Sequence, residues 1–248
     1  MRLKRPPKAR EKTMLRPGAP EGDNSSNGAA QIPCDSPLRD LRGVDNVKIS
    51  KYYPRGSVLF AEGQRPRGVY VLCTGRAKVS VASAEGRTFV LRIAGAGDVL
   101  GLNSVLNDRP AGATVETLER CRIDFVSRED FVKLLDRDKK AYLDVTRALS
   151  SKLSGLIEHA RLLLVSQSAA EKLARLLVRW CDEHGKRTAE GIRINSGFTH
   201  EDIAQTICTS RETVTRMLGE FKRKQIVSLI GNTIFVRNRK ALESVARC

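Results

Sequence analysis

The chain has 248 residues, of which 41% are hydrophobic, so it is long enough for about two domains with apolar cores. Its 44 Lys and Arg residues outnumber its 28 Asp and Glu residues, and the net charge of +16 favours a polyanionic partner such as nucleic acid. No run of about 18 apolar residues and no apolar signal segment is present, so we expect no membrane partner and a cytoplasmic location.

Residues 1–45 are rich in Pro, Gly, Ser, Asn and charge, and they lack periodic apolar residues, so we expect a disordered basic arm. The first 16 residues include seven Lys or Arg residues and one Glu. Such an arm would add non-specific affinity for DNA by releasing counterions. A solvated tail without function accounts for the same composition.

Residues 46–127 consist of short runs of β-branched and aromatic residues that are separated by glycines. Closely spaced short strands of this kind predict a small antiparallel barrel or jelly roll. The expected strands cover residues 58–60, 69–72, 77–81, 89–93, 113–117 and 121–125.

Residues 128–165 are expected to be helical. Ser127 and Asp130 form an N-cap pattern for a short first helix, and a longer helix follows. Its apolar residues recur at steps of three and four, which indicates a coiled-coil-like seam. A helix that packs only on its own domain would show a similar pattern. The seam consists of Tyr142, Val145, Leu149, Leu153, Leu156, Ala160 and Leu163.

Residues 166–248 are expected to form a winged helix-turn-helix. A helix begins at Ser168 and ends by Gly185, and a β segment follows at 191–195. Two apolar runs then flank Gly231-Asn232, which is a strong hairpin signal and predicts the wing. Candidate phosphate contacts of the wing are Lys222, Arg223, Lys224 and Arg237, and each of them is also explained as a solvated surface charge.

Between the β segment and the wing, residues 199–221 indicate two short helices with a break at Cys208-Thr209. Thr199 and Asp202 match a capping box for the first helix. A second cap pair, Thr209 or Ser210 with Glu212 or Thr213, begins the next one. The buried face of this second helix is expected to carry Val214, Met217, Leu218 and Phe221.

The second helix, over residues 210–221, is the candidate recognition helix. In a helix-turn-helix, the side chains of its first turns enter the major groove. Arg has paired donors that match O6 and N7 of guanine, and Glu accepts from N4 of cytosine. Arg211, Glu212 and Arg216 are therefore candidates to read a half-site that contains G and C, with Thr215 on the same face. An ordinary solvated helix pair would also expose such residues.

The segments Ile203-Ala204-Gln205 and Ser210-Arg211-Glu212-Thr213-Val214, followed by Arg216, resemble the signature of the cyclic-AMP receptor / fumarate-nitrate regulator (Crp/Fnr) family of bacterial transcription factors. The resemblance implies that the Arg, Glu and Arg of this helix contact bases. It also places the phosphate-contacting hydroxyls at Thr199, Ser210 and Thr213. Cys208 departs from the family, which usually has Gly in the turn, so we expect modest left-handed strain there.

The segments Gly56–Gly63, Val69–Leu72 and Gly75–Val79 resemble the cyclic-nucleotide-binding β-roll of the same family. The resemblance implies an α+β fold with an N-terminal β-roll, a long dimerisation helix and a C-terminal winged helix-turn-helix. It also implies that the long helix pairs two copies of the chain as a parallel homodimer. The corresponding boundaries are 1–45 for the arm, 46–127 for the roll, 128–165 for the dimerisation helix and 166–248 for the DNA-binding domain.

The effector of this roll is not evident from the sequence. In relatives that bind a cyclic nucleotide, an Arg holds the phosphate and a Glu takes the ribose hydroxyl. Arg109 matches, but Leu102 stands in place of the Glu and Pro110 in place of a Ser or Thr. A structural role, in which Arg109 satisfies backbone carbonyls, explains this arginine equally well. Each lost hydrogen bond costs about 0.5–1.5 kcal/mol, so we expect no cAMP binding in the usual way; the roll senses another ligand or none. The candidate effector-binding residues are Gly101, Leu102, Arg109, Pro110, Ala111 and Leu156, the last lying where relatives carry a Thr/Ser pair.

These patterns favour a dimeric, sequence-specific transcription factor that binds a palindromic site on double-stranded DNA, and they leave RNA polymerase open as a further partner. The alternatives are a cyclic-nucleotide-responsive regulatory protein and a non-specific architectural DNA binder. No nucleophile–base pair, phosphate-binding glycine loop or metal-ligand cluster is evident, so we do not expect an enzyme. The six scattered cysteines include no CxxC pair, which argues against zinc and a cysteine-ligated iron–sulfur cluster. No cofactor is assigned, and a cyclic nucleotide stays open.

Overall fold

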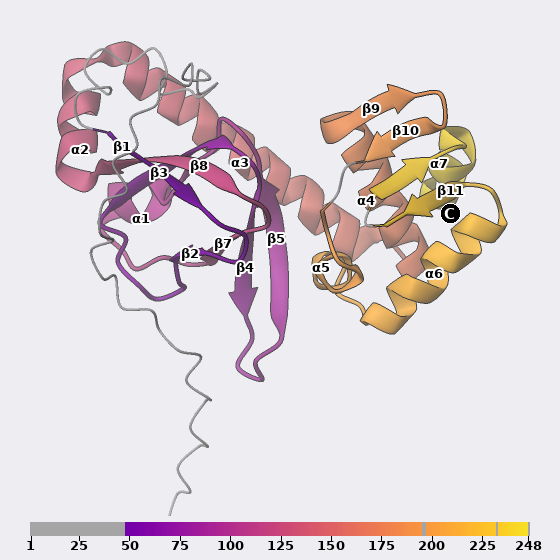
Figure 1. Cartoon of the computed structure of the whole chain (residues 1–248). Coiled ribbons are helices and arrows are strands. Elements are labelled where there is room, and N and C mark those ends of the chain that lie inside the picture. The colour runs from indigo at the N-terminus through magenta and orange to yellow at the C-terminus, as the bar shows by residue number, and fades with distance from the viewer. Residues whose placement is uncertain (1–47, 195–196, 232, 248) are drawn as a thin grey trace, which may run out of the picture. The chain divides into compact units, whose positions relative to one another are not determined.

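The structure is a computed structural model, and it describes residues 48–194, 197–231 and 233–247 (Figure 1). The arm expected over residues 1–45 and Asn232 of the wing turn lie outside the described residues. Within the described ranges, no helix combines the length and the apolar character needed to cross a membrane.

The N-terminal half is a β-roll of two antiparallel four-stranded sheets, with strand orders β1-β8-β3-β6 and β2-β7-β4-β5 (Figure 1). Its elements are β1 (Ile49–Tyr53), β2 (Val58–Phe60), β3 (Gly68–Thr74), β4 (Ala77–Ala82), β5 (Thr88–Ala94), β6 (Val99–Leu100), α1 (Leu102–Asn107), β7 (Thr114–Thr117) and β8 (Cys121–Ser127). The expected strands are all present. Sequence reasoning missed β1, whose residues are mostly exposed, and β6, which has only two residues.

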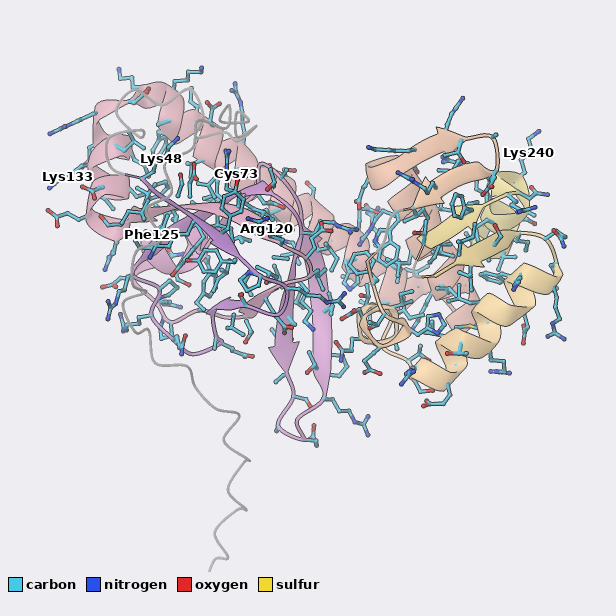
Figure 2. The ribbon with its side chains drawn as sticks, viewed as in Figure 1. Lys48, Cys73, Arg120, Phe125, Lys133 and Lys240 are labelled. Atoms are coloured by element: carbon cyan, nitrogen blue, oxygen red, sulfur yellow. The ribbon has the colours of Figure 1, made fainter. Side chains whose placement is uncertain are left out.

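Successive side chains along each strand point to opposite faces of the sheet, and this alternation explains how the roll packs. Val69 and Val71 of β3 are buried in a cluster that also holds Phe131, while the intervening Tyr70 packs against Phe125 of β8 with ring centroids 5.1 Å apart. Gly75 closes the turn between β3 and β4 with a φ of +88°, a conformation that side-chain-bearing residues rarely adopt. Figure 2 labels Phe125 on the roll and Lys133, which projects outward from the helix that follows it.

Two helices follow the roll, α2 (Arg128–Arg137) and α3 (Lys139–Val165). The expected cap of α2 is confirmed, because Ser127 Oγ accepts from the Asp130 backbone N–H at 3.1 Å. The seam expected along α3 divides into two groups. Val145 is buried against the roll, whereas Tyr142 and Leu153 are each 61% exposed.

The C-terminal half contains α4 (Ala169–His184), β9 (Gly185–Thr188), β10 (Gly191–Ile194), α5 (His200–Thr206), α6 (Arg211–Arg223), β11 (Val227–Ile230), β12 (Thr233–Val236) and α7 (Arg239–Arg247). Its sheet has the order β11-β12-β10-β9, and the hairpin expected around Gly231 is formed by β11 and β12. The helices cover a core that includes Leu173, Leu177 and Trp180 of α4. Strand β9 and helix α7 were not predicted.

His159 is a buried polar residue on α3, with 5% of its surface exposed. Burial and, to a smaller extent, the positive charge of Arg179 lower the pKa of its imidazole, a hydrogen bond with the Val90 backbone opposes both effects, and the resulting pKa is about 4. Its Nδ1 has no hydrogen-bond partner within the described part of the chain, so Nε2 makes that bond. The folded protein therefore holds this histidine neutral.

Substituting His159 with Gln should remove one source of acid sensitivity. The unfolded histidine titrates near pH 6.5 and the folded one near 4, so the unfolded state binds the proton more readily between these values. Stability from this group is therefore fully present above pH 6.5 and is lost as pH falls towards 4, by about 3 kcal/mol in total. Gln keeps an amide donor near the Nε2 position but does not titrate.

Urea unfolding of both proteins at pH 7.5 and pH 5 measures this effect, and the comparison cancels the titration of all other groups. We expect the wild-type protein to lose more stability than His159→Gln over this interval. Equal losses in the two proteins would show that His159 is not the group responsible.

Candidate nucleic-acid interface

Helices α5 and α6 each begin at a side-chain cap. Thr199 Oγ1 accepts from the backbone N–H of Asp202 at 3.1 Å, and the Asp202 carboxylate accepts from the Thr199 N–H at 2.9 Å, so the expected capping box is confirmed. At α6, Ser210 Oγ accepts from the Thr213 N–H at 3.2 Å. Of the alternative N-cap residues for α6, Ser210 is therefore the one that caps the helix, and its backbone partner is Thr213. Such a cap contributes about 0.5–2 kcal/mol and fixes where the helix starts.

The turn between the two helices is tight and left-handed at Cys208, whose φ is +54°. The next residue donates its backbone N–H to the Ala204 carbonyl at 3.0 Å, which ends α5. The strain expected from a non-glycine residue at this position is thus present in the backbone. For an L-residue the left-handed conformation costs roughly 1–2 kcal/mol.

Helix α6 has one buried face and one exposed face. The buried face carries Val214, Met217, Leu218 and Phe221, as expected from the sequence. These residues share a cluster with Ile203 and Ile207 of the α5 segment and with apolar residues of α4. The exposed face carries Arg211, Glu212, Thr215 and Arg216. The predicted base-reading residues are therefore presented to solvent, and their contacts with DNA remain a prediction.

A hydrogen bond between side chains links α5 to the exposed face of α6. His200 Nδ1 lies 2.8 Å from Thr215 Oγ1, and the Thr215 hydroxyl donates to the Arg211 carbonyl at 2.9 Å. Because that hydroxyl has a single hydrogen, it accepts from Nδ1–H of His200. Sequence reasoning left His200 without a role, because fifteen residues separate it from its partner.

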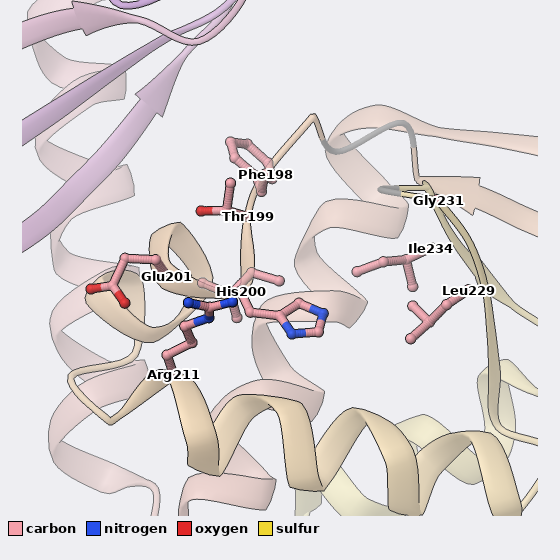
Figure 3. A pocket seen from close by; sticks show the side chains of 9 residues that line it. Phe198, Thr199, His200, Glu201, Arg211, Leu229, Gly231 and Ile234 are labelled. Atoms are coloured by element: carbon pink, nitrogen blue, oxygen red, sulfur yellow. The ribbon is translucent and has the colours of Figure 1, made fainter.

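A hollow of about 430 Å³ lies beside this link, between the start of α5, the start of α6 and the β11–β12 hairpin (Figure 3). His200 and Arg211 extend into it from the two helices, and Leu229 and Ile234 line it from the hairpin. Arg211 is therefore positioned at the start of α6, the candidate recognition helix, and extends towards the start of α5 (Figure 3).

Glu212 is held in its ionised form. Hydrogen bonds from its own backbone N–H and from the Ser210 hydroxyl lower the pKa of its carboxyl below the usual value, and the nearby Arg211 acts in the same direction. An ionised carboxylate is an acceptor only, which is the form that a cytosine amino group requires.

The basic residues expected in the wing fall in two places. Lys222 and Arg223 belong to the last turn of α6, which runs longer than expected, and Lys224 is its C-cap. Only Arg237 directly follows a wing strand, and its guanidinium donates to Ser228 Oγ of β11 at 3.0 Å. The assignment of Lys222 and Arg223 to the wing was wrong, because the α6 hydrogen bonds continue through them.

The candidate effector residues divide between a cavity and the surface. Gly101, Leu102, Ala111 and Leu156 line one cavity of about 430 Å³ between the roll and α3. Arg109 and Pro110 are exposed and do not belong to its lining. Lys152 and Arg92 also line this cavity and were missed, since nothing in their sequence spacing links α3 to β5. Among the described residues, no group of three or more His, Cys, Asp and Glu side chains is arranged to hold a metal ion.

Two family models match the chain in succession. The cyclic nucleotide-binding domain matches residues 50–138, and the Crp-like helix-turn-helix domain matches residues 171–245. The first covers the roll with α2, and the second covers the segment from α4 to α7, including α5 and α6.

Curated relatives align over most of the chain. The CRP-like cAMP-activated global transcriptional regulator of Mycobacterium tuberculosis is 24% identical over 195 residues, covering 79% of this chain and 87% of that protein. The fumarate and nitrate reduction regulatory protein of Yersinia pestis is 26% identical over 218 residues, covering 87% of this chain and 86% of that protein. The relatives therefore include both branches of the family that the recognition-helix residues resemble.

The fold is shared with solved structures. FixK2 from Bradyrhizobium japonicum superposes with a TM-score of 0.71 at 22% identity, covering 80% of this chain and 97% of that chain. TTHB099, a CRP-family transcriptional regulator from Thermus thermophilus, gives a TM-score of 0.69 at 22% identity. At these identities the likeness establishes the architecture alone.

Replacing Cys208 with Gly should stabilise the helix-turn-helix. Gly relieves the left-handed strain of roughly 1–2 kcal/mol but adds about 0.4–1 kcal/mol of chain entropy to the unfolded state. We expect a net gain of about 0.5–1 kcal/mol in the free energy of unfolding, measured by urea denaturation. Cys208→Ala is the matched control, since it removes the thiol and keeps the strain. A gain of the same size in the Ala variant would show that the thiol, and not the backbone, limits stability.

Proposed function

Because the chain belongs to the Crp/Fnr family of transcriptional regulators, we propose that it acts as a homodimer that reads a palindromic DNA operator through α6. The observation that carries the proposal is the exposed Arg211–Glu212–Arg216 face on a helix whose opposite face is fully packed. Such a helix presents its side chains in a fixed direction, as major-groove readout requires.

In each half of the proposed dimer, some residues would contact bases and others would contact phosphates. Arg211 and Arg216 supply paired donors for guanine, and Glu212 supplies the acceptor for cytosine. Thr199, Ser210 and Thr213 lie at the two helix starts, where hydroxyls and backbone N–H groups suit phosphates. Thr215, hydrogen-bonded to His200, lies between the arginines on the same face.

The proposed dimer interface is the outer face of α3. Besides Tyr142 and Leu153, this helix exposes Ile157 by 49% and Leu164 by 84%. Apolar side chains of this size on one long helix favour pairing with a second copy, as in a coiled coil. A two-fold axis would place two recognition helices about 34 Å apart, one turn of DNA, and so require a palindrome.

For the effector, we propose that the roll does not bind cAMP in the usual way. Leu102 is only 2% exposed and fills the position at which the resemblance implies a ribose-binding Glu. The cavity lining contains no carboxylate, and Arg109 is exposed and is not among the lining residues. RNA polymerase as a further partner remains a prediction from the resemblance.

Arg211→Ala and Arg216→Ala should each weaken binding to the best operator by about 1–3 kcal/mol and relax base preference at one position of each half-site. The operator is first selected from random duplexes with the purified wild-type protein. Fluorescence anisotropy then measures the affinity of each protein for this duplex and for a scrambled one at about 0.15–0.2 M salt, where specific binding survives and non-specific binding is weak.

Lys240→Ala is the control, because it removes one exposed positive charge from α7 in the same half of the chain (Figure 2). We expect it to change the affinity for both duplexes little. If the arginine variants weaken both duplexes equally, these residues contact phosphates and the proposed readout is incorrect. Failure of selection to yield a palindrome would count against the dimeric arrangement.

Calorimetric titration of the full-length protein with cAMP should give no saturable binding at micromolar concentrations. The physical reason is the loss of the ribose and base partners, each worth about 0.5–1.5 kcal/mol. Micromolar affinity with one site per chain would refute this part of the proposal and leave the DNA-binding part standing.

A further inference from the structure

The cavity between the roll and α3 combines a mostly apolar lining with two cationic side chains. Most of its lining is apolar or small, from Phe60, Val99 and Leu100 on the roll to Leu149 and Leu153 on α3. Its volume of about 430 Å³ lies within the range of roughly 300–1,000 Å³ that is typical of small-molecule sites. Sites of this kind hold an apolar body and orient it with a few polar groups.

Two cations line this cavity, and they differ in how they are paired. The Arg92 guanidinium forms an ion pair with the Asp98 carboxylate at 3.0 Å. Lys152 Nζ instead donates a hydrogen bond to the backbone carbonyl of Val99, and it forms no ion pair with any residue that the structure describes. A carbonyl oxygen satisfies one of the three ammonium donors and carries no full negative charge.

The surroundings of Lys152 therefore disfavour its charged form. Burial and, to a smaller extent, the charge of Arg92 lower its pKa, Asp98 partly offsets these effects, and the resulting pKa is about 8. No Asp or Glu is among the residues that line the cavity, so the missing negative charge is not supplied from the cavity wall. An anion placed beside Nζ would relieve the cost of keeping this lysine charged.

We propose that this cavity binds a small carboxylic acid with an apolar body, whose carboxylate pairs with the Lys152 ammonium. The apolar walls around Leu100, Leu153 and Leu156 take the body, and Lys152 fixes the head group beside Val99. As the effector site of a regulator, this assignment rests on the proposed function. Ligand binding is measured without DNA, so the two proposals fail separately.

A purely structural role for Lys152 makes different predictions. In that case Nζ only ties α3 to the Val99 carbonyl of β6, and an added carboxylate gains nothing from it. Substitution of the lysine would then lower stability without changing which ligands bind. The experiment below separates these two roles through the chemistry of the ligand.

Isothermal titration of the full-length protein with 3-phenylpropionate and with the neutral 3-phenylpropanamide measures the contribution of the charge. We expect the acid to bind roughly 10- to 100-fold more tightly, as for a charge-assisted hydrogen bond. Because an anion raises the pKa of Lys152, binding at pH 8 should also take up as much as about half a proton. Titration in two buffers with different ionisation enthalpies measures this uptake.

Lys152→Met keeps the length of the side chain and removes its charge, so it should abolish both the preference for the acid and the proton uptake. The control is Lys133→Met, which removes an exposed lysine that pairs with Glu129 on α2 and projects outward (Figure 2). It should retain both signals. Circular dichroism checks that each variant is folded, and octanoate provides a second apolar body with the same head group.

Three results would overturn the proposal. They are equal affinity for the acid and the amide, a preference for the acid that survives Lys152→Met, and failure of both acids to saturate the wild-type protein at millimolar concentrations. If Lys152→Met does not fold, proton uptake by the wild-type protein at pH 8 decides alone, and its absence overturns the proposal. An effect of either acid on operator affinity tests only whether the site is linked to DNA binding.

Discussion

The burial of one face of α6 is the constraint on which the proposed DNA-reading surface depends. Val214, Met217, Leu218 and Phe221 are buried in the C-terminal core, and each such side chain contributes roughly 1.5–3 kcal/mol when fully buried. A single base contact is worth a similar amount. The free energy gained by burying these four side chains is therefore about four times that of any one base contact. The packing can thus hold the helix in one orientation whichever residues its exposed face carries.

The separation of α6 into a buried face and an exposed face helps to explain why the helix-turn-helix could be predicted in detail from the sequence. Local rules determine it: caps at Thr199 and Ser210, apolar residues at helical spacing and a break at Cys208. Each rule acts over a few residues. The strands of the roll were predictable for the same reason, since alternation and glycine turns are local, whereas β1 escaped because its side chains are mostly exposed and carry no alternating signal.

The parts that sequence reasoning missed depend on contacts between distant segments. His200 meets Thr215 across the turn, and Lys152 meets the carbonyl of a residue 53 positions earlier in the chain. Arg109 shows a different limit, because a match to a motif suggested it as an effector-binding residue, whereas its side chain is exposed and is not among the residues that line the cavity. Spacing identifies which residues share a face of one element, but only the fold brings faces of different elements together.

The charged side chains of α6 and the cavity lysine Lys152 differ in how much hydration they keep in the folded protein. On α6 the charged groups are exposed and stay hydrated in the free protein, so the proposed pairing with DNA would replace that hydration only on binding. Lys152 has already lost part of its hydration on folding, and its lowered pKa reflects that loss. A ligand that places a negative charge beside Lys152 lowers the free energy of keeping this lysine charged. The same ion pair at an exposed lysine would contribute much less. A partly buried cation without a carboxylate partner is thus better suited to selecting a ligand than to stabilising the fold.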